Sequence, residues 1–253
     1  MLTEKVQAFP SEAPSDHQIL VILAKVSDID EPEESLYFDW LTRAEIQRVR
    51  SFRDLTASRC SLLGRAMVKA VAAQWLKTSP QDVCITYLES GKPVLQEATS
   101  NQWHFSVTHH QDCVAVAFAN APLGIDLETP QKQDRIKLAR RYFLPEESHH
   151  LASLEGSERS EYFTWLWTLK EAEVKRCGSA LAHVMGKAGF KIAPPRIYAT
   201  DASQAISYYL YRSSDQALLS LACSTLSVSV PECFLGRPYT GYQRTSLDLV
   251  AKT

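Results

Sequence analysis

Apolar positions in the first half of the chain follow strand and helix spacing in turn. A short apolar, β-branched run predicts a buried strand over residues 18–26, followed by an acidic, Pro-containing loop around 28–34. Helical spacing predicts one helix over 37–52 and a longer one that Asp54 caps and that ends near Leu76. Shorter strand-like runs follow at 83–88, 104–107 and 113–118, and a turn is predicted at 91–93.

The second half repeats this order of elements. Strand Leu123–Glu128 is followed by helical spacing over Asp134–Phe143, a helix opened by Pro145, and a long helix over Glu158–Arg176. Strand-like runs then stand at 206–211, 218–222 and 226–230, and the residues beyond Pro238 have the pattern of a tail. An α+β chain of two similarly built lobes fits this order. Pro122 and the small residues beside it predict a boundary there, between an N-terminal lobe of residues 1–120 and a C-terminal lobe of 121–253.

Composition narrows the possible partners. The chain has 253 residues and a net charge of −2, so no strongly basic field favours nucleic acid or an anionic membrane. Its six cysteines are scattered without a CxxC pair, which is typical of buried thiols in a reducing compartment and gives no clustered zinc ligands. The N-terminus lacks a signal-like apolar run, and no stretch is long enough to span a membrane. We therefore expect a soluble, cytoplasmic protein.

Two acidic residues share one face of the strand over 123–128. Residues two apart on a strand point the same way, so Asp126 and Glu128 lie together while Ile125 and Leu127 face the core. Paired carboxylates are hard oxygen ligands that suit Mg²⁺. Taken alone, the segment is more typical of an ordinary strand that ends in exposed acids.

The long helix contributes a third carboxylate and two lysines. Trp167, Glu171 and Lys175 follow one another at four-residue steps, so they stack along one face of the helix. Glu171 can join the two strand acids at a metal, and Lys170 can neutralise a phosphate as a point charge. The structural alternative is a surface Glu–Lys pair with the tryptophan in the core.

A third polar segment joins the strands predicted at 104–107 and 113–118. It contains Thr108, His109 and His110, whose hydroxyl and imidazole groups can donate to a phosphate, and Gly91-Lys92-Pro93 comes shortly before it. The alternative is a polar hairpin loop without a ligand. Cys113 begins an apolar strand and is interpreted as a structural thiol rather than a nucleophile.

Four short motifs stand in order along the chain. They are Gly-Lys-Pro, a Phe-x-Ile-Ser-His-like segment, Gly-Ile-Asp-x-Glu, and Trp-x-x-Lys-Glu-x-x-x-Lys followed by Gly-x-x-Leu. Here they occupy Gly91–Pro93, Phe105–His109, Gly124–Glu128, and Trp167–Lys175 with Gly178 and Leu181. This set resembles the Sfp-type 4′-phosphopantetheinyl transferases, over about residues 41–181. The resemblance implies two α/β lobes related by pseudo-twofold symmetry.

The resemblance also implies a reaction and a site. The 4′-phosphopantetheine arm of coenzyme A would pass to a serine of an acyl or peptidyl carrier protein, and 3′,5′-ADP would leave. Coenzyme A would lie in the cleft between the lobes and share Mg²⁺ with Asp126, Glu128 and Glu171. Either Glu171 or a water on the metal would accept the serine proton, and Lys175 would stabilise the transferring phosphate.

Further coenzyme A contacts are implied by the same motifs. Lys170 would meet the phosphates of the leaving nucleotide, and Thr108 and His109 would hold the 3′-phosphate together with an arginine of the first lobe. The remaining predicted contacts are Arg48 and Arg59 as candidates for that arginine, and Lys92 and Pro93 in the nucleotide pocket.

Two self-sufficient lobes also favour a monomer.

The chain departs from the family pattern at several positions. Thr108 stands where serine is usual, His110 and Ala180 replace small residues, Glu45 stands where lysine is expected, and the spacing around residues 62–64 is shifted by one. Three other functions use similar residues. They are an Mg²⁺-dependent hydrolase of a nucleotide diphosphate, a non-catalytic coenzyme A-binding module, and a scaffold with surface salt bridges.

Overall fold

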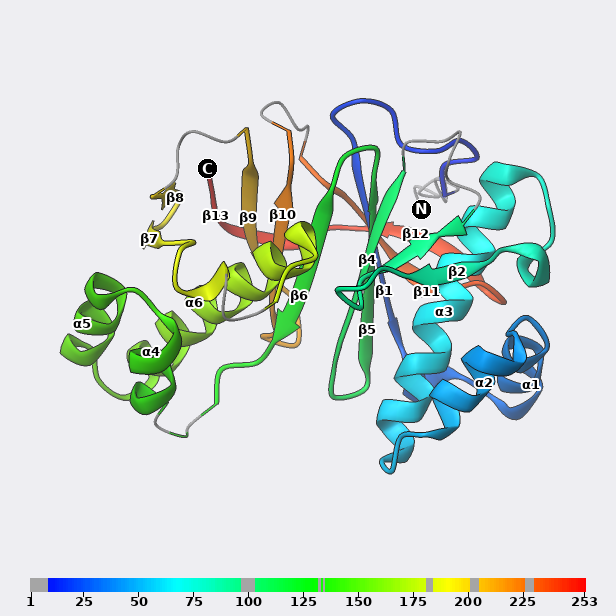
Figure 1. Ribbon diagram of the computed structural model, residues 1–253, viewed down its shortest axis with the longest axis horizontal. Helices are drawn as coiled ribbons and strands as arrows, with labels where there is room; N and C mark the ends of the chain where they lie inside the picture. Colours follow the sequence, from blue (N-terminus) through cyan, green and yellow to red (C-terminus); the bar gives the residue numbers. More distant parts are fainter. Residues whose placement is uncertain are drawn as a thin grey trace, which may run out of the picture. The chain divides into compact units, whose positions relative to one another are not determined.

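The computed structural model describes residues 9–96, 103–131, 133, 135–180, 184–200, 205–225 and 230–253. The chain forms two compact units, one from residues 1–87, 93–120 and 229–246, the other from 88–92, 121–228 and 247–253. Helices and sheets occur in both units, so the predicted α+β class is confirmed (Figure 1). The predicted lobes are continuous segments, whereas these units are not. The domain division and the pseudo-twofold symmetry stay predictions.

The first unit contains a five-stranded sheet in the order β12-β11-β1-β5-β4. Its strands, and the separate pair β2-β3, are β1 (Ile19–Lys25), β4 (His104–His110), β5 (Cys113–Ala119), β11 (Glu232–Arg237), β12 (Gly241–Thr245), β2 (Ile85–Tyr87) and β3 (Pro93–Leu95). The central strand β1 runs antiparallel to β5 and parallel to β11. Its side chains are almost fully buried, which explains the unbroken apolar run that predicts it.

Three helices belong to this unit: α1 (Glu31–Asp39), α2 (Arg43–Arg50) and α3 (Leu55–Leu76). The predicted helix over 37–52 is wrong, because the chain forms two helices with a break around Trp40. Thr42 caps the second helix through a reciprocal pair of bonds with Glu45. The loop predicted around 28–34 is also wrong beyond Asp30, since Pro32 is tolerated in the first turn that Asp30 caps.

Helix α3 confirms the long helix predicted from Asp54. The Asp54 carboxylate accepts a hydrogen bond from the Ala57 backbone N–H at 2.7 Å, and Lys77 ends the helix in the left-handed conformation. The helix packs on β5 and β4. Its buried face includes Leu62, Leu63, Met67 and Val71, which join the strand side chains in one core.

The second unit contains a six-stranded sheet in the order β6-β10-β9-β13-β8-β7. Its elements are β6 (Leu123–Glu128), β7 (Phe190–Ala193), β8 (Arg196–Ala199), β9 (Ser207–Arg212), β10 (Leu218–Cys223), β13 (Asp248–Lys252), α4 (Ile136–Tyr142), α5 (Pro145–Ser153) and α6 (Gly156–Cys177). Helix α6 lies along β6 and β10, and α4 and α5 pack beside each other (Figure 1). The helices predicted here are confirmed, with Pro145 at the first position of α5.

Two segments predicted to lie outside the sheets are strands in the structure. The residues beyond Pro238 are not a tail, since β12 pairs with β11 and β13 pairs with β9. Much of β12 is exposed at a sheet edge, so its polar sequence lacks the apolar signal of a central strand. Strand β4 continues through His110, so the polar loop predicted from Thr108 is strand and the turn is Gln111-Asp112. The strand predicted over 226–230 lies mostly outside the described residues.

Two further findings concern the whole described chain. Among the described helices, none is both long enough and apolar enough to cross a lipid bilayer. All six cysteines lie in the described part, and no disulfide joins any two of them.

Candidate functional site

Strand β6 positions the two acids predicted on one strand face. Gly124 and Asp126 are two residues apart on the face against α6, since a side chain at 124 would run into the backbone of that helix. Asp126 is only 6% exposed, and its register partner on β10 is the buried Ser220. Glu128 ends the strand and is half-buried. The predicted alternation along this strand is therefore present, although Ile125 and Leu127 are buried as well.

Helix α6 brings Lys175 to Asp126. The Lys175 ammonium donates to the Asp126 carboxylate at 2.7 Å and to the Ile125 carbonyl at 3.0 Å. Glu171 precedes Lys175 by one helical turn on the same face. One strand and one helix of a single unit thus bring together four of the residues predicted to do the chemistry, namely Asp126, Glu128, Glu171 and Lys175.

The acidic groups of this cluster influence one another. Burial, with the negative charges of Asp126 and Glu128, raises the pKa of Glu171 to about 7, although Lys175 acts in the opposite direction. Burial disfavours the charged carboxylate, and like charges nearby disfavour it further. Without a cation beside it, a carboxyl group with this pKa exchanges a proton near neutral pH.

The chemistry of these side chains fits a divalent cation. Asp126, Glu128 and Glu171 supply hard oxygen donors, and a cation among them would offset the burial and the repulsion that raise the Glu171 pKa. Within the described ranges, however, no three or more His, Cys, Asp or Glu side chains lie in an arrangement that could hold a metal ion. The Lys175 ammonium provides the positive charge beside Asp126.

Lys170 lies away from this cluster. Its side chain is fully buried and forms an ion pair with Glu147 at 2.9 Å, while its ammonium also donates to the Met185 and Ala188 carbonyls. Glu147 in turn accepts from the backbone N–H groups of Leu144 and Phe190. Lys170 therefore joins α5, α6 and the start of β7 and offers no exposed surface to a phosphate. This burial opposes the predicted phosphate contact.

Replacing Lys170 with methionine should mainly change stability. The free energy of unfolding should fall by about 3–5 kcal/mol, because Glu147 would keep a buried charge without its counter-ion. Denaturant unfolding measures this loss, and the double variant Lys170→Met/Glu147→Gln should recover part of it. A Lys170→Met protein of wild-type stability that binds coenzyme A poorly would instead support the predicted phosphate contact.

Lys92 and Pro93 stand at the predicted Gly-Lys-Pro turn. Gly91 adopts the left-handed backbone conformation with φ of 83°, which glycine adopts without strain. Pro93 begins β3 opposite Tyr87. The Lys92 ammonium donates to the Arg176 carbonyl at 2.7 Å, at the end of α6. The structure thus gives Lys92 protein partners in the second unit.

The two predicted arginines of the first unit have different surroundings. Arg59 donates to Glu34 at 3.0 Å and to the Ile29 carbonyl at 2.8 Å. Arg48 is exposed, and its guanidinium lies 4.6 Å from the centre of the Tyr87 ring. Arg65, which sequence reasoning missed, donates to the Tyr87 hydroxyl at 2.8 Å. Arg65 follows Arg59 by six residues on α3, which is not a same-face helical spacing, so the sequence pattern gave no signal for it.

Thr108 and His109 do not share a face. Consecutive residues of a strand point to opposite sides of the sheet, and both residues lie within β4. Thr108 is buried, whereas His109 is exposed. The structure therefore does not bring these two predicted 3′-phosphate contacts together. The family-motif residue Leu181 lies outside the described residues.

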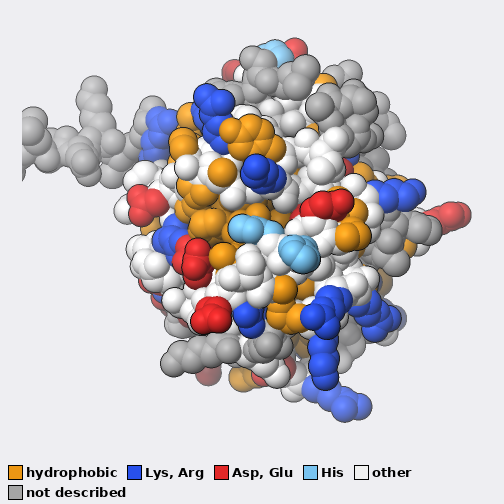
Figure 2. Space-filling view, turned by 90° about the vertical axis from the view of Figure 1, so that its left-hand side faces the viewer, with side chains coloured by type: hydrophobic (Ala, Val, Ile, Leu, Met, Phe, Trp, Pro, Cys, Tyr) orange, Lys and Arg blue, Asp and Glu red, His pale blue; other side chains and the backbone are white. Residues whose placement is uncertain are grey.

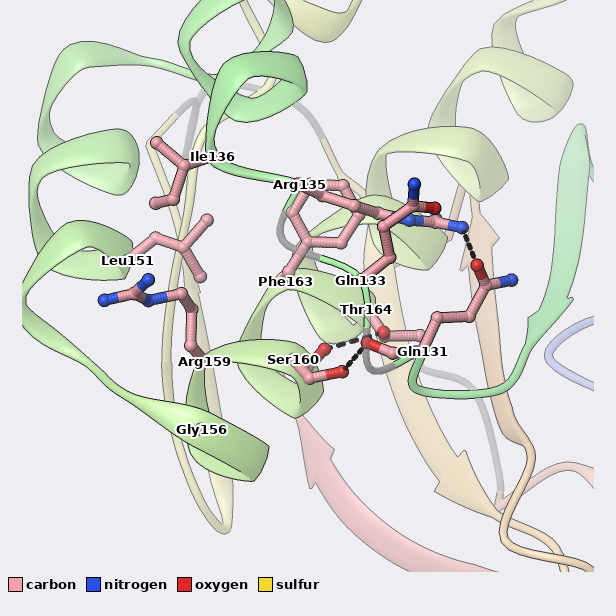
Figure 3. Close-up of a pocket in the computed structure, with 10 residues that line it drawn as sticks. All are labelled: Gln131, Gln133, Arg135, Ile136, Leu151, Gly156, Arg159, Ser160, Phe163 and Thr164. Carbon is pink, nitrogen blue, oxygen red and sulfur yellow. Dashed lines mark hydrogen bonds between the residues drawn. The ribbon is translucent and has the colours of Figure 1, made fainter.

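Two cavities of the second unit lie apart from the predicted residues. One of about 200 Å³ borders the N-terminal half of α6, where the Arg135 guanidinium lies 5.5 Å from the centre of the Phe163 ring and Ser160 donates to the Gln131 carbonyl (Figure 3). Another, of about 490 Å³, is lined mainly by α5 and β7 and includes His150. Figure 2 shows apolar side chains gathered beside histidines on one face of the molecule.

Comparison with known proteins gives a consistent result. Residues 122–222 match a family model described as the 4′-phosphopantetheinyl transferase superfamily, and residues 30–121 match one described as 4′-phosphopantetheinyl transferase, N-terminal. The chain is 26% identical over 154 residues to 4′-phosphopantetheinyl transferase Sfp of Bacillus subtilis (strain 168), over 61% of this chain and 67% of that relative. It is 30% identical over 159 residues to 4′-phosphopantetheinyl transferase HetI of Nostoc sp. (strain PCC 7120), with coverage of 61% and 67%. It is also 30% identical over 132 residues to 4′-phosphopantetheinyl transferase psf-1 of Bacillus pumilus, over 52% of this chain and 55% of that relative.

Proposed function

Because the chain belongs to the 4′-phosphopantetheinyl transferase superfamily, we propose that it transfers the 4′-phosphopantetheine arm of coenzyme A to a serine hydroxyl of a carrier protein. The strongest support from the structure is the meeting of Asp126, Glu171 and Lys175 in one unit. The hydrolase, binding-module and scaffold alternatives are not favoured, because the similar proteins are named as transferases.

The reaction joins the serine oxygen to the phosphorus that carries the pantetheine arm. The bond from that phosphorus to the bridging oxygen of the pyrophosphate breaks, and 3′,5′-ADP leaves with the electron pair. Glu171, one helical turn before Lys175 on the same face of α6, accepts the serine proton. Lys175 keeps a positive charge beside the reacting phosphate, and Asp126 holds that lysine in place.

Asp126, Glu128 and Glu171 would hold an Mg²⁺ ion. When bound, this ion would neutralise charge on the pyrophosphate oxygens and orient them. The contacts predicted for the adenosine end of coenzyme A stay predictions; of these, the side chains of Arg48 and His109 are exposed. The acyl or peptidyl nature of the carrier, the cytoplasmic location and the monomeric state stay predictions.

Intact mass spectrometry of a carrier protein tests the proposed reaction. Incubation with coenzyme A, Mg²⁺ and this protein should add one phosphopantetheine to the carrier and release an equal amount of 3′,5′-ADP. A chelator should stop the transfer, and Mg²⁺ added in excess should restore it. Steady release of 3′,5′-ADP without any carrier would support the hydrolase instead, and an unmodified carrier would contradict the proposal.

Replacing Lys175 with methionine should separate catalysis from binding. The transfer rate should fall about 10²-fold, because the Lys175 ammonium stabilises the transition state more than it stabilises bound coenzyme A. The Kd for coenzyme A should therefore change little. Single-turnover kinetics and calorimetric titration measure the two quantities. Equal losses in rate and affinity would show that Lys175 acts only in ground-state binding.

A further inference from the structure

The ammonium group of Lys92 lies between the ends of the two elements that carry the proposed site. It donates to the Arg176 carbonyl at 2.7 Å, and the Leu123 carbonyl lies 3.5 Å away. Leu123 is the first residue of β6, and Arg176 belongs to the last turn of α6. One cation thus contacts the strand that carries Asp126 and the helix that carries Lys175.

The end of α6 is a favourable place for a positive charge. The last carbonyl groups of a helix have no partner within the helix and form the negative end of its dipole. Helix α6 ends at Cys177, and Gly178 follows in the left-handed conformation with φ of 62°. The Arg176 carbonyl is one of these terminal groups, so the bond from Lys92 supplies a partner that the helix cannot.

The aliphatic part of Lys92 also fits this end of the helix closely. A Cβ atom built at Gly178 would lie 2.9 Å from Lys92 Cδ, so the absence of a side chain at 178 makes room for the lysine. Burial, and then the nearby Arg176, oppose this favourable effect of the helix end and lower the pKa of Lys92 to about 8, while Cys177 and Glu173 raise it.

The contact lies directly beside the proposed catalytic lysine. Lys175 precedes Arg176 in the same turn, and its ammonium reaches both Asp126 and the Ile125 carbonyl. We infer that Lys92 is a positioning residue, which fixes the last turn of α6 against the start of β6 and so holds Lys175 at Asp126. This role differs from the nucleotide contact that the sequence motif predicts. Its kinetic consequence rests on the proposed function, whereas its structural consequence does not.

Three variants test the inference by kinetics. Lys92→Met keeps the aliphatic chain and removes the ammonium, Lys92→Arg keeps a cationic donor, and Lys191→Met removes an exposed lysine of the same unit as a control. Lys92→Met should lower kcat for transfer about tenfold or more, because small misplacements of catalytic groups are costly, and leave KM for coenzyme A within about twofold. Lys92→Arg should recover most of kcat. An increase in KM with kcat unchanged would assign Lys92 to the nucleotide and overturn the inference.

Hydrogen exchange provides a measurement that needs no activity. In Lys92→Met, the backbone amides of residues 174–178 and 123–126 should exchange about tenfold or more faster than in wild type or Lys191→Met, since a charge-assisted bond at the helix end is lost. Unchanged exchange there would overturn the inference even if transfer is slow. If the wild-type protein modifies no carrier, the proposed function fails, and the exchange result still decides the position of α6.

Discussion

Replacing Asp126 with asparagine should lower the rate of transfer by about 10³-fold, the upper range for the loss of one electrostatic group in an active site. Asparagine keeps the shape of the side chain but removes the charge that holds the Lys175 ammonium at 2.7 Å. It also removes an oxygen donor from the acids proposed to hold Mg²⁺. The effect should therefore exceed that of Lys175→Met, which leaves the acids intact.

The fold should tolerate this change, which makes the rate informative. Asp126 is buried, but its partner Lys175 is 30% exposed, so the lysine can turn to water when the carboxylate is lost. Thermal unfolding should show a modest loss of stability, and Asp248→Asn, at an exposed acid of the same unit, should change neither rate nor stability. Transfer by Asp126→Asn within tenfold of the wild-type rate would remove Asp126 from the proposed machinery.

Local periodicity predicts which face of its own element carries Asp126, Glu171 or Lys175, whereas the convergence of the strand and the helix was implied by the family resemblance. Strand alternation places Asp126 on the face that α6 covers, and helical spacing places Glu171 and Lys175 one turn apart. Both patterns survive in the structure because both elements are long and regular.

The same periodicity could not reveal the partner of Lys170. Its neighbour Glu171 faces the site, but Lys170 points about a quarter turn away, toward Glu147. Glu147 is 23 positions earlier in the sequence. It also accepts a hydrogen bond from the Leu144 N–H, the bond that caps the start of α5. Only tertiary packing brings the two together, and the resulting burial of Lys170 opposes the phosphate contact that the family resemblance implied.

Lys92 illustrates a similar limit in a loop. The Gly-Lys-Pro sequence predicts a turn, and Gly91 adopts the left-handed conformation that such a turn uses. The sequence does not indicate that the lysine reaches a carbonyl at the end of a helix 84 residues away. The helix-end glycine at 178 was part of the recognised motif, yet its role in accommodating Lys92 is a feature of packing.

Gly124 is a residue whose importance sequence reasoning underestimated. It stands two positions before Asp126 on the same strand face, and a Cβ atom there would lie 1.9 Å from the Ala172 carbonyl oxygen and 2.5 Å from the Arg176 N atom. Both are backbone atoms of α6, so no side-chain rotation can relieve the overlap. The close approach of strand and helix is what allows Lys175 to reach the Ile125 carbonyl.

Gly124→Ala should therefore disturb the second unit more than most single substitutions. We expect a loss of about 3 kcal/mol or more in the free energy of unfolding, because α6 must move away from β6 to admit the methyl group. Transfer should fall at least as strongly as in Lys175→Met, since the same movement separates Lys175 from Asp126. Denaturant unfolding and the carrier modification assay measure the two effects.

Gly186→Ala is the matched control for this substitution. A Cβ atom at 186 would meet no other group within 4 Å, so the same added methyl group should change stability and rate very little. If Gly124→Ala were as stable and as active as Gly186→Ala, α6 could not lie as close to β6 as the structure places it. The geometry of Lys175, Asp126 and Lys92 would then need revision together, because all three depend on the distance between this strand and this helix.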